Sequence, residues 1–256
     1  MKVIQKIGIL TTVLSITISA AAPTSLGVDI PVKGKYVWRG FCYNPEPVLW
    51  PDIWMAWDGL KVNAFGSIDM TDALGNRGKM TEFDFIMDYT HSFRYVALSI
   101  GYSHYTFPNT GSSYTGELYS TVGTNFEYGN IALKGYYDIL IAGGLYISPE
   151  FSASYVFGLF EPSLTLSIGY GSKKHNSFWA EHDKSCMTDF TGVFGLVFTF
   201  PGKLGEYLSL SGDLNYAVLI NKDLADDFKE KSGYTGKNFY GGLGINYNFL
   251  FVKDKE

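Results

Sequence analysis

The sequence predicts an all-β fold, namely a transmembrane, antiparallel, up-and-down β-barrel of about twelve strands. Segments in which apolar and polar residues alternate recur along the chain, as in PSLTLSIGYG at 162–171. The connections between these segments alternate between short turns and longer, more polar loops. Aromatic residues make up 17% of the chain and charged residues only 18%, and 29 residues are glycine. This composition favours strands and turns over helices.

Residues 1–22 have the pattern of a secretory signal peptide, and residues 23–256 are expected to form one outer-membrane barrel. Lys2 and Lys6 precede a short apolar stretch at 7–19, and three alanines at 20–22 provide a cleavage site. After residue 22 no apolar run approaches the roughly 20 residues that a membrane helix needs. We therefore expect export to the outer membrane of a Gram-negative bacterium, with strands crossing the lipid.

The charge of the exported chain is negative. Without the two lysines of the signal, the remaining 18 basic side chains face 25 acidic ones. Binding to a phosphate backbone requires clustered Lys and Arg. Nucleic acid is therefore not expected as a partner.

The first six strands are expected at 26–39, 49–56, 60–69, 81–90, 94–106 and 114–126. The fourth shows the pattern clearly, because side chains of a strand alternate between two faces. One face carries Phe83, Phe85, Met87 and Tyr89, and the other carries Glu82, Asp84, Ile86 and Asp88.

The remaining six strands are expected at 131–139, 144–156, 163–171, 185–200, 207–217 and 236–251. In the strand at 163–171, Leu164, Leu166, Ile168 and Tyr170 oppose Ser163, Thr165, Ser167 and Gly169. Helical periodicity appears only at 222–231, where one or two turns could form inside the last long loop.

Two features favour a barrel whose apolar face meets lipid and whose polar face lines a lumen. The polar faces are rich in Ser, Gly, Asn and Thr, which suits a crowded interior. The apolar faces often end in aromatic residues, as the interfacial girdles of outer-membrane barrels do. The expected girdle residues are Tyr36, Trp38, Trp57, Tyr89, Tyr102, Tyr137, Tyr155, Tyr170, Tyr216 and Tyr247. A secreted β-sandwich is the alternative.

Two stretches resemble the TorF-family porins, a group of conserved bacterial outer-membrane proteins. In the first, Tyr36, Trp38, Arg39 and Gly40 match an aromatic-x-aromatic-Arg-Gly motif, and Pro47 and Leu49 match the loop that follows. In the second, the matching residues are Gly101, Tyr102, Tyr105, Pro108, Tyr114, Glu117, Leu118 and Tyr119. The resemblance covers about the first half of the chain and implies a signal-bearing outer-membrane β-barrel with a porin role.

Strand parity places eleven acidic and five basic side chains in the lumen. The acids are Asp29, Asp52, Asp69, Glu82, Asp84, Asp88, Glu117, Asp138, Glu150, Asp189 and Asp213, and the bases are Lys33, Lys35, Arg39, Lys61 and Lys134. An acidic lining concentrates cations and excludes anions. We therefore expect a narrow channel for small polar solutes or ions that prefers cations. The alternative is a closed barrel in which these charges neutralise one another.

Arg39 is expected in the lumen, where it would pair with an acid such as Glu117 or Asp84 and fix a constriction. The alternative is an arginine at the rim that reaches lipid headgroups.

The loop at 173–186 gathers His175, Glu181, His182, Asp183 and Cys186, but their spacing fits no standard metal site. A solvated loop of mixed charge is the better interpretation, so no metal or other cofactor is expected. The two cysteines, Cys42 and Cys186, both fall on the long-loop side, and an oxidising compartment would allow them to form a disulfide.

No catalytic residue is expected. The sequence contains neither GxSxG nor HExxH, and no glycine-rich phosphate loop. His104 follows Ser103, but neighbouring residues of a strand point to opposite faces, so the two do not form a dyad. Two alternatives to a channel remain: a lipid-modifying enzyme, and a structural or adhesive barrel that acts through its long loops. Outer-membrane lipids are expected partners in every case, and the sequence leaves the oligomeric state open.

Overall fold

The computed structural model describes residues 25–250, so the expected signal peptide at 1–22 lies outside the described residues. The barrel wall contains β1 (Ser25–Lys33), β4 (Val48–Leu49), β5 (Asp52–Trp57), β6 (Leu60–Asp69), β7 (Met80–Ser92), β8 (Ala97–Thr106), β9 (Thr115–Phe126), β10 (Gly129–Asp138), β11 (Leu145–Ser154), β12 (Phe160–Gly171), β13 (Cys186–Thr199), β14 (Leu208–Leu219) and β15 (Lys237–Leu250). The connections carry β2 (Tyr36–Trp38), β3 (Phe41–Asn44), α1 (Lys173–Ala180), the 3₁₀ helix η1 (Gly202–Glu206) and α2 (Lys222–Ser232).

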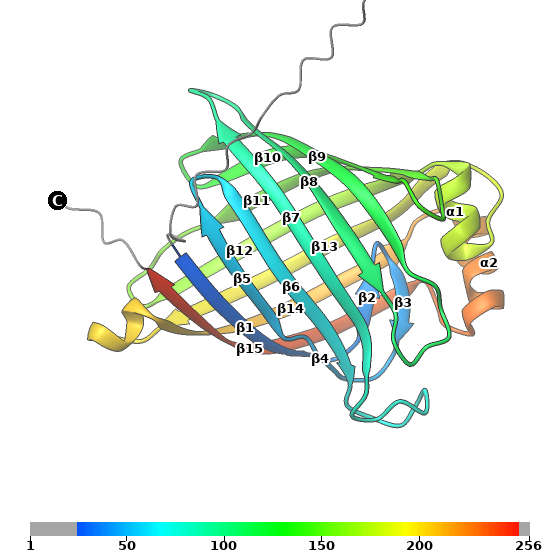
Figure 1. The fold of residues 1–256 in the computed structure, drawn as a ribbon, viewed down its shortest axis with the longest axis horizontal. Helices are drawn as coiled ribbons and strands as arrows, with labels where there is room; N and C mark the ends of the chain where they lie inside the picture. The colour runs from blue at the N-terminus through cyan, green and yellow to red at the C-terminus, as the bar shows by residue number, and fades with distance from the viewer. Residues whose placement is uncertain (1–24, 251–256) are drawn as a thin grey trace, which may run out of the picture.

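The wall is a closed antiparallel β-barrel with twelve strand positions, as the sequence predicts (Figure 1). Each wall strand pairs with its neighbour in the chain, and β1 closes the ring by pairing with β15 from Ser25↔Leu250 to Lys33↔Gly242. β4 and β5 share one position between β1 and β6. Pro51 separates them, because proline has no N–H to donate to a strand ladder.

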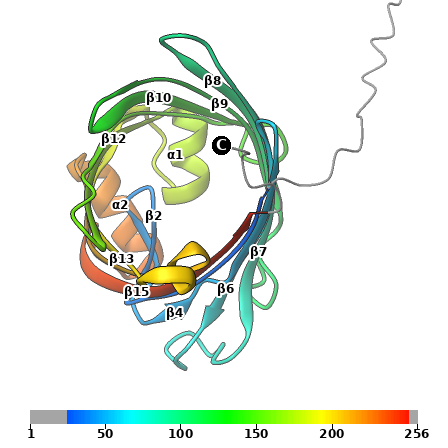
Figure 2. The ribbon, with the colours of Figure 1, turned by 90° about the vertical axis from the view of Figure 1, so that its left-hand side faces the viewer.

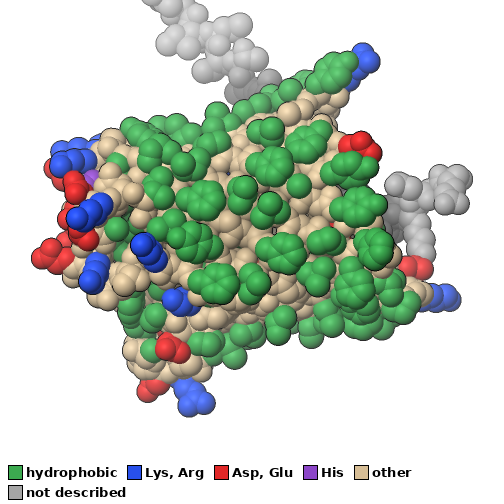
Figure 3. Space-filling model, turned by 180° about the vertical axis from the view of Figure 1, so that it is seen from behind, with side chains coloured by type: hydrophobic (Ala, Val, Ile, Leu, Met, Phe, Trp, Pro, Cys, Tyr) green, Lys and Arg blue, Asp and Glu red, His purple; other side chains and the backbone are tan. Residues whose placement is uncertain are grey.

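The alternation predicted from sequence determines which side chains face out. Phe83, Phe85 and Met87 are exposed on the outer wall, whereas Glu82 and Asp84 are buried inside. Figure 3 shows apolar side chains over the face of the outer wall that is seen from behind, with Lys, Arg, Asp and Glu gathered mostly at its ends. Exposed apolar surface of this extent is unfavourable in water and suits contact with lipid tails. A closed barrel with this exterior replaces the alternative of a secreted sandwich.

Short turns join the strands at one end of the barrel, and the longer connections lie at the other. Asp58 and Gly59, both with positive φ, form the tight turn between β5 and β6. The long connections carry the β2–β3 hairpin and both helices. Viewed from the short-turn end, α1 and β2 appear inside the ring of strands (Figure 2).

The strand expected at 26–39 is wrong beyond residue 33. β1 ends at Lys33, and the chain then leaves the wall to form the separate β2–β3 hairpin. Tyr36 and Trp38 are therefore not part of the outer girdle. Both side chains pack on other aromatic rings inside the barrel. The ring centroids of Tyr36 and Trp50 lie 5.3 Å apart, and those of Trp38 and Trp179 lie 4.8 Å apart.

The helix expected at 222–231 is confirmed as α2, which runs over three turns. The side chain of Asn221 accepts a hydrogen bond from the Leu224 N–H at its start, and Gly233 ends it with φ +77°. α1 was not predicted, because its segment is expected as a solvated loop. Within the described part of the chain no helix is long and apolar enough to span a membrane.

Candidate pore constriction

The β2–β3 hairpin turns back on itself at Arg39 and Gly40. Both residues have positive φ, 49° and 79°, which is the conformation of a two-residue hairpin turn. The turn touches the wall: a Cβ on Gly40 would lie 2.7 Å from Asp189 Cβ and 2.7 Å from Leu219 Cδ2. The hairpin therefore reaches β13 and β14 and narrows the lumen at the long-loop end.

Arg39 forms a bidentate ion pair with Glu117 of β9. Its Nη1 lies 2.8 Å from Glu117 Oε1, and its Nη2 lies 2.7 Å from Oε2. Both side chains are almost fully buried, with exposed fractions of 7% and 1%. The Oη of Tyr105 also donates to Glu117, at 3.0 Å. Arg39 is thus in the lumen, paired with one of the two acids that the sequence suggests, but it projects from the hairpin turn and not from strand one.

Aromatic rings surround the Arg39 guanidinium. Its Cζ lies 4.1 Å from the ring centroid of Trp38, 4.2 Å from that of Tyr146 and 4.5 Å from that of Tyr136. A guanidinium at such distances gains cation–π energy, and more when it is shielded from water. The contacts join the hairpin to β10 and β11.

His175 of α1 completes the contacts of Arg39. Its Nε2 lies 3.3 Å from Arg39 Nη1, and its ring stacks on Tyr146 with centroids 5.2 Å apart. Burial and then the Arg39 charge lower the pKa of His175 to about 3. The imidazole is therefore neutral at physiological pH, and Nε2 can accept from the guanidinium.

Polar side chains fix α1 in place. Ser172 caps its N-terminus, and the buried Asn176 donates from Nδ2 to the carbonyls of Gly171 and Lys184 at 3.1 and 2.8 Å. His182 is also buried, and its Nδ1 lies 2.7 Å from Asp227 Oδ2 of α2. The solvated loop expected at 173–186 is wrong for these residues, because they satisfy backbone groups and link the two helices.

A small apolar cluster closes the space between the hairpin, the two helices and β14. Its buried members are Phe41, Ala180, Leu219, Leu224 and Phe228. Trp38, Tyr43 and Trp179 pack against it. The long-loop end of the lumen is therefore a packed structure and not an open mouth.

The lumen charges predicted from strand parity lie inside, and none of them is highly exposed. Besides Arg39, two bases form ion pairs: Lys33 with Asp213, and Lys134 with Glu150 at 2.8 Å. Lys35 donates to Asn238 Oδ1 at 3.4 Å, and the ammonium of Lys61 lies 5.0 Å from the Trp54 ring centroid.

Several of the acids accept hydrogen bonds from neutral donors. The acid and donor pairs are Asp29 with Trp54 Nε1, Asp52 with Asn63, Asp69 with Thr81, Asp88 with Tyr119, Asp138 with Thr115 and Asp189 with Tyr146. Asp138 also accepts four backbone N–H groups of the 140–143 connection at 3.0–3.3 Å. Glu82 and Asp84 lie next to each other on β7. The acids thus remain in excess over the bases inside the barrel.

Neither a disulfide nor a metal cluster of three or more His, Cys, Asp and Glu side chains forms in residues 25–250. Cys42 and Cys186 are free, so the structure does not contain the disulfide that the sequence allows. No group of three or more His, Cys, Asp and Glu residues in this range is arranged to hold a metal ion.

In residues 25–250 no hydrogen bond joins a histidine ring to a Ser, Thr or Cys side chain. His104 Nδ1 lies 3.0 Å from Tyr102 Oη, His175 contacts Asn176 and Arg39, His182 contacts Asp227, and His91 packs on Phe93. A Ser, Thr or Cys nucleophile needs such a base within hydrogen-bond reach.

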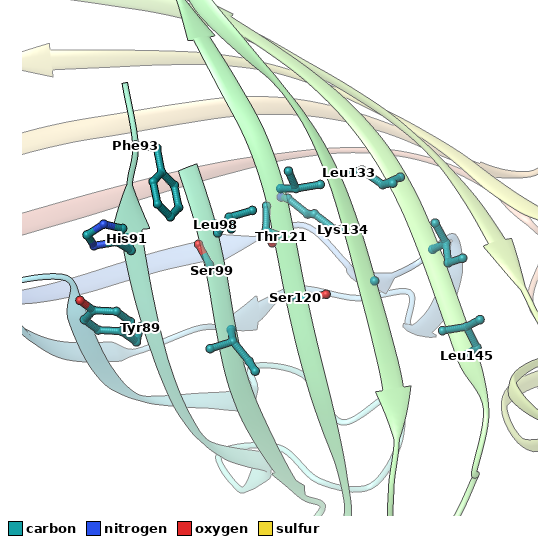
Figure 4. Close-up of a pocket in the computed structure, with 14 residues that line it drawn as sticks. Tyr89, His91, Phe93, Leu98, Ser99, Ser120, Thr121, Leu133, Lys134 and Leu145 are labelled. Atoms are coloured by element: carbon teal, nitrogen blue, oxygen red, sulfur yellow. The ribbon is translucent and has the colours of Figure 1, made fainter. Parts of the chain in front are cut away.

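The outer wall has a shallow apolar hollow of about 550 Å³ over β7 to β11 (Figure 4). Ser120 and Gly135 leave space there between larger side chains such as Tyr89, Leu98 and Leu133. Because most of its lining side chains face outward, the hollow belongs to the lipid-facing surface and not to the lumen.

Sequence reasoning missed Tyr36, Trp38, His175 and Trp179 as parts of the constriction. Gly40 is a local signal for a turn, because glycine adopts positive φ without steric cost. Nothing local indicates that α1 and the hairpin meet.

No family model matches the sequence, and no curated protein matches it. Among solved structures, the NanC porin is 11% identical with a TM-score of 0.53, covering 89% of this chain and 100% of that chain. The KdgM porin is 10% identical with a TM-score of 0.53, covering 88% and 99%. Outer membrane phospholipase A from Escherichia coli is 10% identical with a TM-score of 0.47, covering 90% and 94%. At these identities the two porins show a shared fold, that of an outer-membrane β-barrel.

Proposed function

We propose that this protein is a channel of the bacterial outer membrane through which small polar solutes or ions diffuse passively, with a preference for cations. The apolar outer wall, the porin fold and the resemblance to the TorF-family porins support this proposal. Outer-membrane lipids would contact the whole outer wall.

The observation that carries the cation preference is the charge balance inside the barrel. Eleven acids and five bases occupy the lumen positions, and three of the bases are already paired with an acid, in Lys33–Asp213, Arg39–Glu117 and Lys134–Glu150. The unpaired acids outnumber the two remaining lysines. Negative charge on a low-dielectric wall raises the local concentration of cations.

The packed long-loop end supports a second candidate, a barrel that is closed at rest. Arg39 holds the hairpin to β9, and the apolar cluster around Phe41 fills the space behind it. A channel with this constriction would conduct small ions with a low single-channel conductance, whereas a closed barrel would not conduct.

Single-channel recording on the purified protein in planar bilayers tests the proposal, after a heat-modifiable gel shift has confirmed a folded barrel. We expect small conductance steps and, in a KCl gradient, a reversal potential of the sign for cation selectivity. Anion selectivity would refute the cation preference. Silence in the wild type together with conduction after replacement of 35–46 by a short Gly-Ser linker would identify the closed barrel.

A further inference from the structure

Glu82 and Asp84 form a pair of adjacent acids on the inner face of β7. They are two residues apart, so both side chains point into the lumen. Each residue is 4% exposed. Because they share this face at neighbouring inward positions, the two carboxyl groups act electrostatically on each other. Two carboxylates this close repel strongly when they are shielded from water.

No ion pair of the described residues involves Glu82 or Asp84. The Oη of Tyr36 donates a hydrogen bond to Glu82 Oε2, so this bond satisfies only one of the four carboxyl oxygens of the pair. Asp84 Oδ1 is buried without a hydrogen-bond partner. A buried polar atom without a partner costs free energy, and more when it belongs to a charged group.

The β2–β3 hairpin adds a second unpartnered oxygen near this pair. Tyr43 Oη is buried without a hydrogen-bond partner, and the Tyr43 ring centroid lies 5.8 Å from that of Tyr36. Glu82 interacts electrostatically with both phenols. The pair therefore has one phenol bound to it and a second phenol nearby, and no described basic side chain forms an ion pair with it.

We propose that Glu82 and Asp84, with Tyr36 beside them, form a cation-binding site in the lumen that takes a hard cation such as Ca²⁺. Oxygen ligands suit Ca²⁺, which accepts carboxylates and neutral oxygens in flexible geometry and keeps water at its open positions. The inference deepens the proposed function, because a permeating cation would bind at this site.

Two carboxylates are few ligands for Ca²⁺, so the affinity should be low. Sites with few charged ligands have dissociation constants of about 0.1–1 mM. Weak binding fits a channel, in which an ion must also leave its site.

Calcium binding can be measured on the full-length exported chain, folded in detergent, whether or not the barrel conducts. Isothermal titration with CaCl₂ at constant ionic strength is the direct measurement, and the shift of the unfolding temperature with CaCl₂ is the second. We expect one site with a dissociation constant near about 1 mM. Asp84→Asn and Glu82→Gln should each weaken it about tenfold or more, because each removes one charged ligand.

Asp88→Asn is the matched control. Asp88 lies on the same strand and the same inner face, but Tyr119 donates to it at 3.0 Å. This variant should bind Ca²⁺ as the wild type does. An absence of binding in the wild type would mean that the pair holds a shared proton instead and would overturn the inference, as would equal binding in the Asp84→Asn variant. Calcium binding without conduction would leave the site in place and count against the proposed function alone.

Discussion

Arg39 combines an unusual backbone conformation with a buried charge. Its φ of 49° is uncommon for a residue with a side chain, and its guanidinium pairs with Glu117 while lying against three aromatic rings. A buried charge that loses its partner is strongly unfavourable. The docking of the hairpin should therefore depend on this one residue.

Replacing Arg39 tests that dependence. Arg39→Ala leaves Glu117 buried without a charge partner, which we expect to destabilise hairpin docking by about 3–5 kcal/mol. Hydrogen exchange of the amides at 34–47 should become faster while the wall strands stay protected. Lys173→Ala is the control, since its pair with Asp183 is largely exposed and should contribute less than about 1 kcal/mol. Unchanged exchange in Arg39→Ala would show that the apolar cluster alone holds the hairpin.

Gly40 provides a second test at the hairpin turn. Gly40→Ala adds a Cβ at positive φ, 2.7 Å from Asp189 Cβ and Leu219 Cδ2, so the hairpin must shift away from the wall. Gly75→Ala is matched in backbone strain, with φ +72°, but has nothing within 4 Å. Both variants should lose about 1–2 kcal/mol from the left-handed conformation, and only Gly40→Ala should also speed exchange at 34–47. Equal behaviour of the two would contradict the contact with the wall.

The lowered pKa of His175 predicts that the docking of α1 weakens in acid. Its pKa is about 3 when α1 is docked, below the ordinary value of 6.5, so the docked state binds its proton less well than the undocked state. The stabilisation is fully present above pH 6.5 and is lost as the pH falls from 6.5 towards 3. Proteolysis within 172–185 by an acid-tolerant protease should therefore increase between pH 7 and pH 4. His175→Gln, which stays neutral, should remove most of this pH dependence, and an unaltered pH profile in that variant would assign the response to another group.

At the scale of elements, the wall could be predicted from sequence and the contents of the lumen could not. The faces of β7 and β12 follow from a period of two, which any short window of sequence shows. The alternation of apolar and polar residues continues through Tyr36 and Trp38. It therefore predicts that the first wall strand continues, although the chain leaves the wall after Lys33. After β1 ends at Lys33, the hairpin packs inside the barrel, where Trp38 contacts Trp179, and such a contact between distant segments leaves no local signal. α1 was not predicted because its buried residues include the polar His175 and Asn176, so its buried face has no apolar helical pattern in the sequence.

The two faces of β12 give a prediction for the wall. Leu164 is exposed on the outer wall, whereas Thr165 points inward and contacts Ser152 Oγ at 3.1 Å. Leu164→Arg should destabilise the barrel in lipid by about 2–4 kcal/mol if it lies near the bilayer centre. Thr165→Arg should cost less, because the lumen is polar. Unfolding in urea from lipid vesicles measures both, and a larger cost for Thr165→Arg would invert the assignment of faces.

At the scale of the whole molecule, the excess of acids inside the barrel should act on ions through the field of the wall. Such a field is screened over about 10 Å in 0.1 M salt and about 3 Å in 1 M salt. The proposed cation preference, measured in planar bilayers, should therefore be strong at 0.1 M KCl and decrease towards 1 M. A preference that does not change with salt would point to a single tight contact site and not to the lining as a whole.

The pairing of β1 with β15 also has a consequence for the assembly of the barrel. Residues 25–33 hydrogen-bond to residues 242–250, so the two wall strands farthest apart in the chain are neighbours in the barrel. Hairpins between consecutive strands can form early, because their loops are short, whereas this seam must bring together distant segments at a larger entropic cost. Until the seam forms, both strands present unpaired backbone groups, which lipid cannot satisfy. In a circular permutant that starts within the β5–β6 turn, β15 and β1 would be consecutive strands and could pair as an ordinary hairpin. The final barrel should be the same, but the slowest step of its assembly should differ.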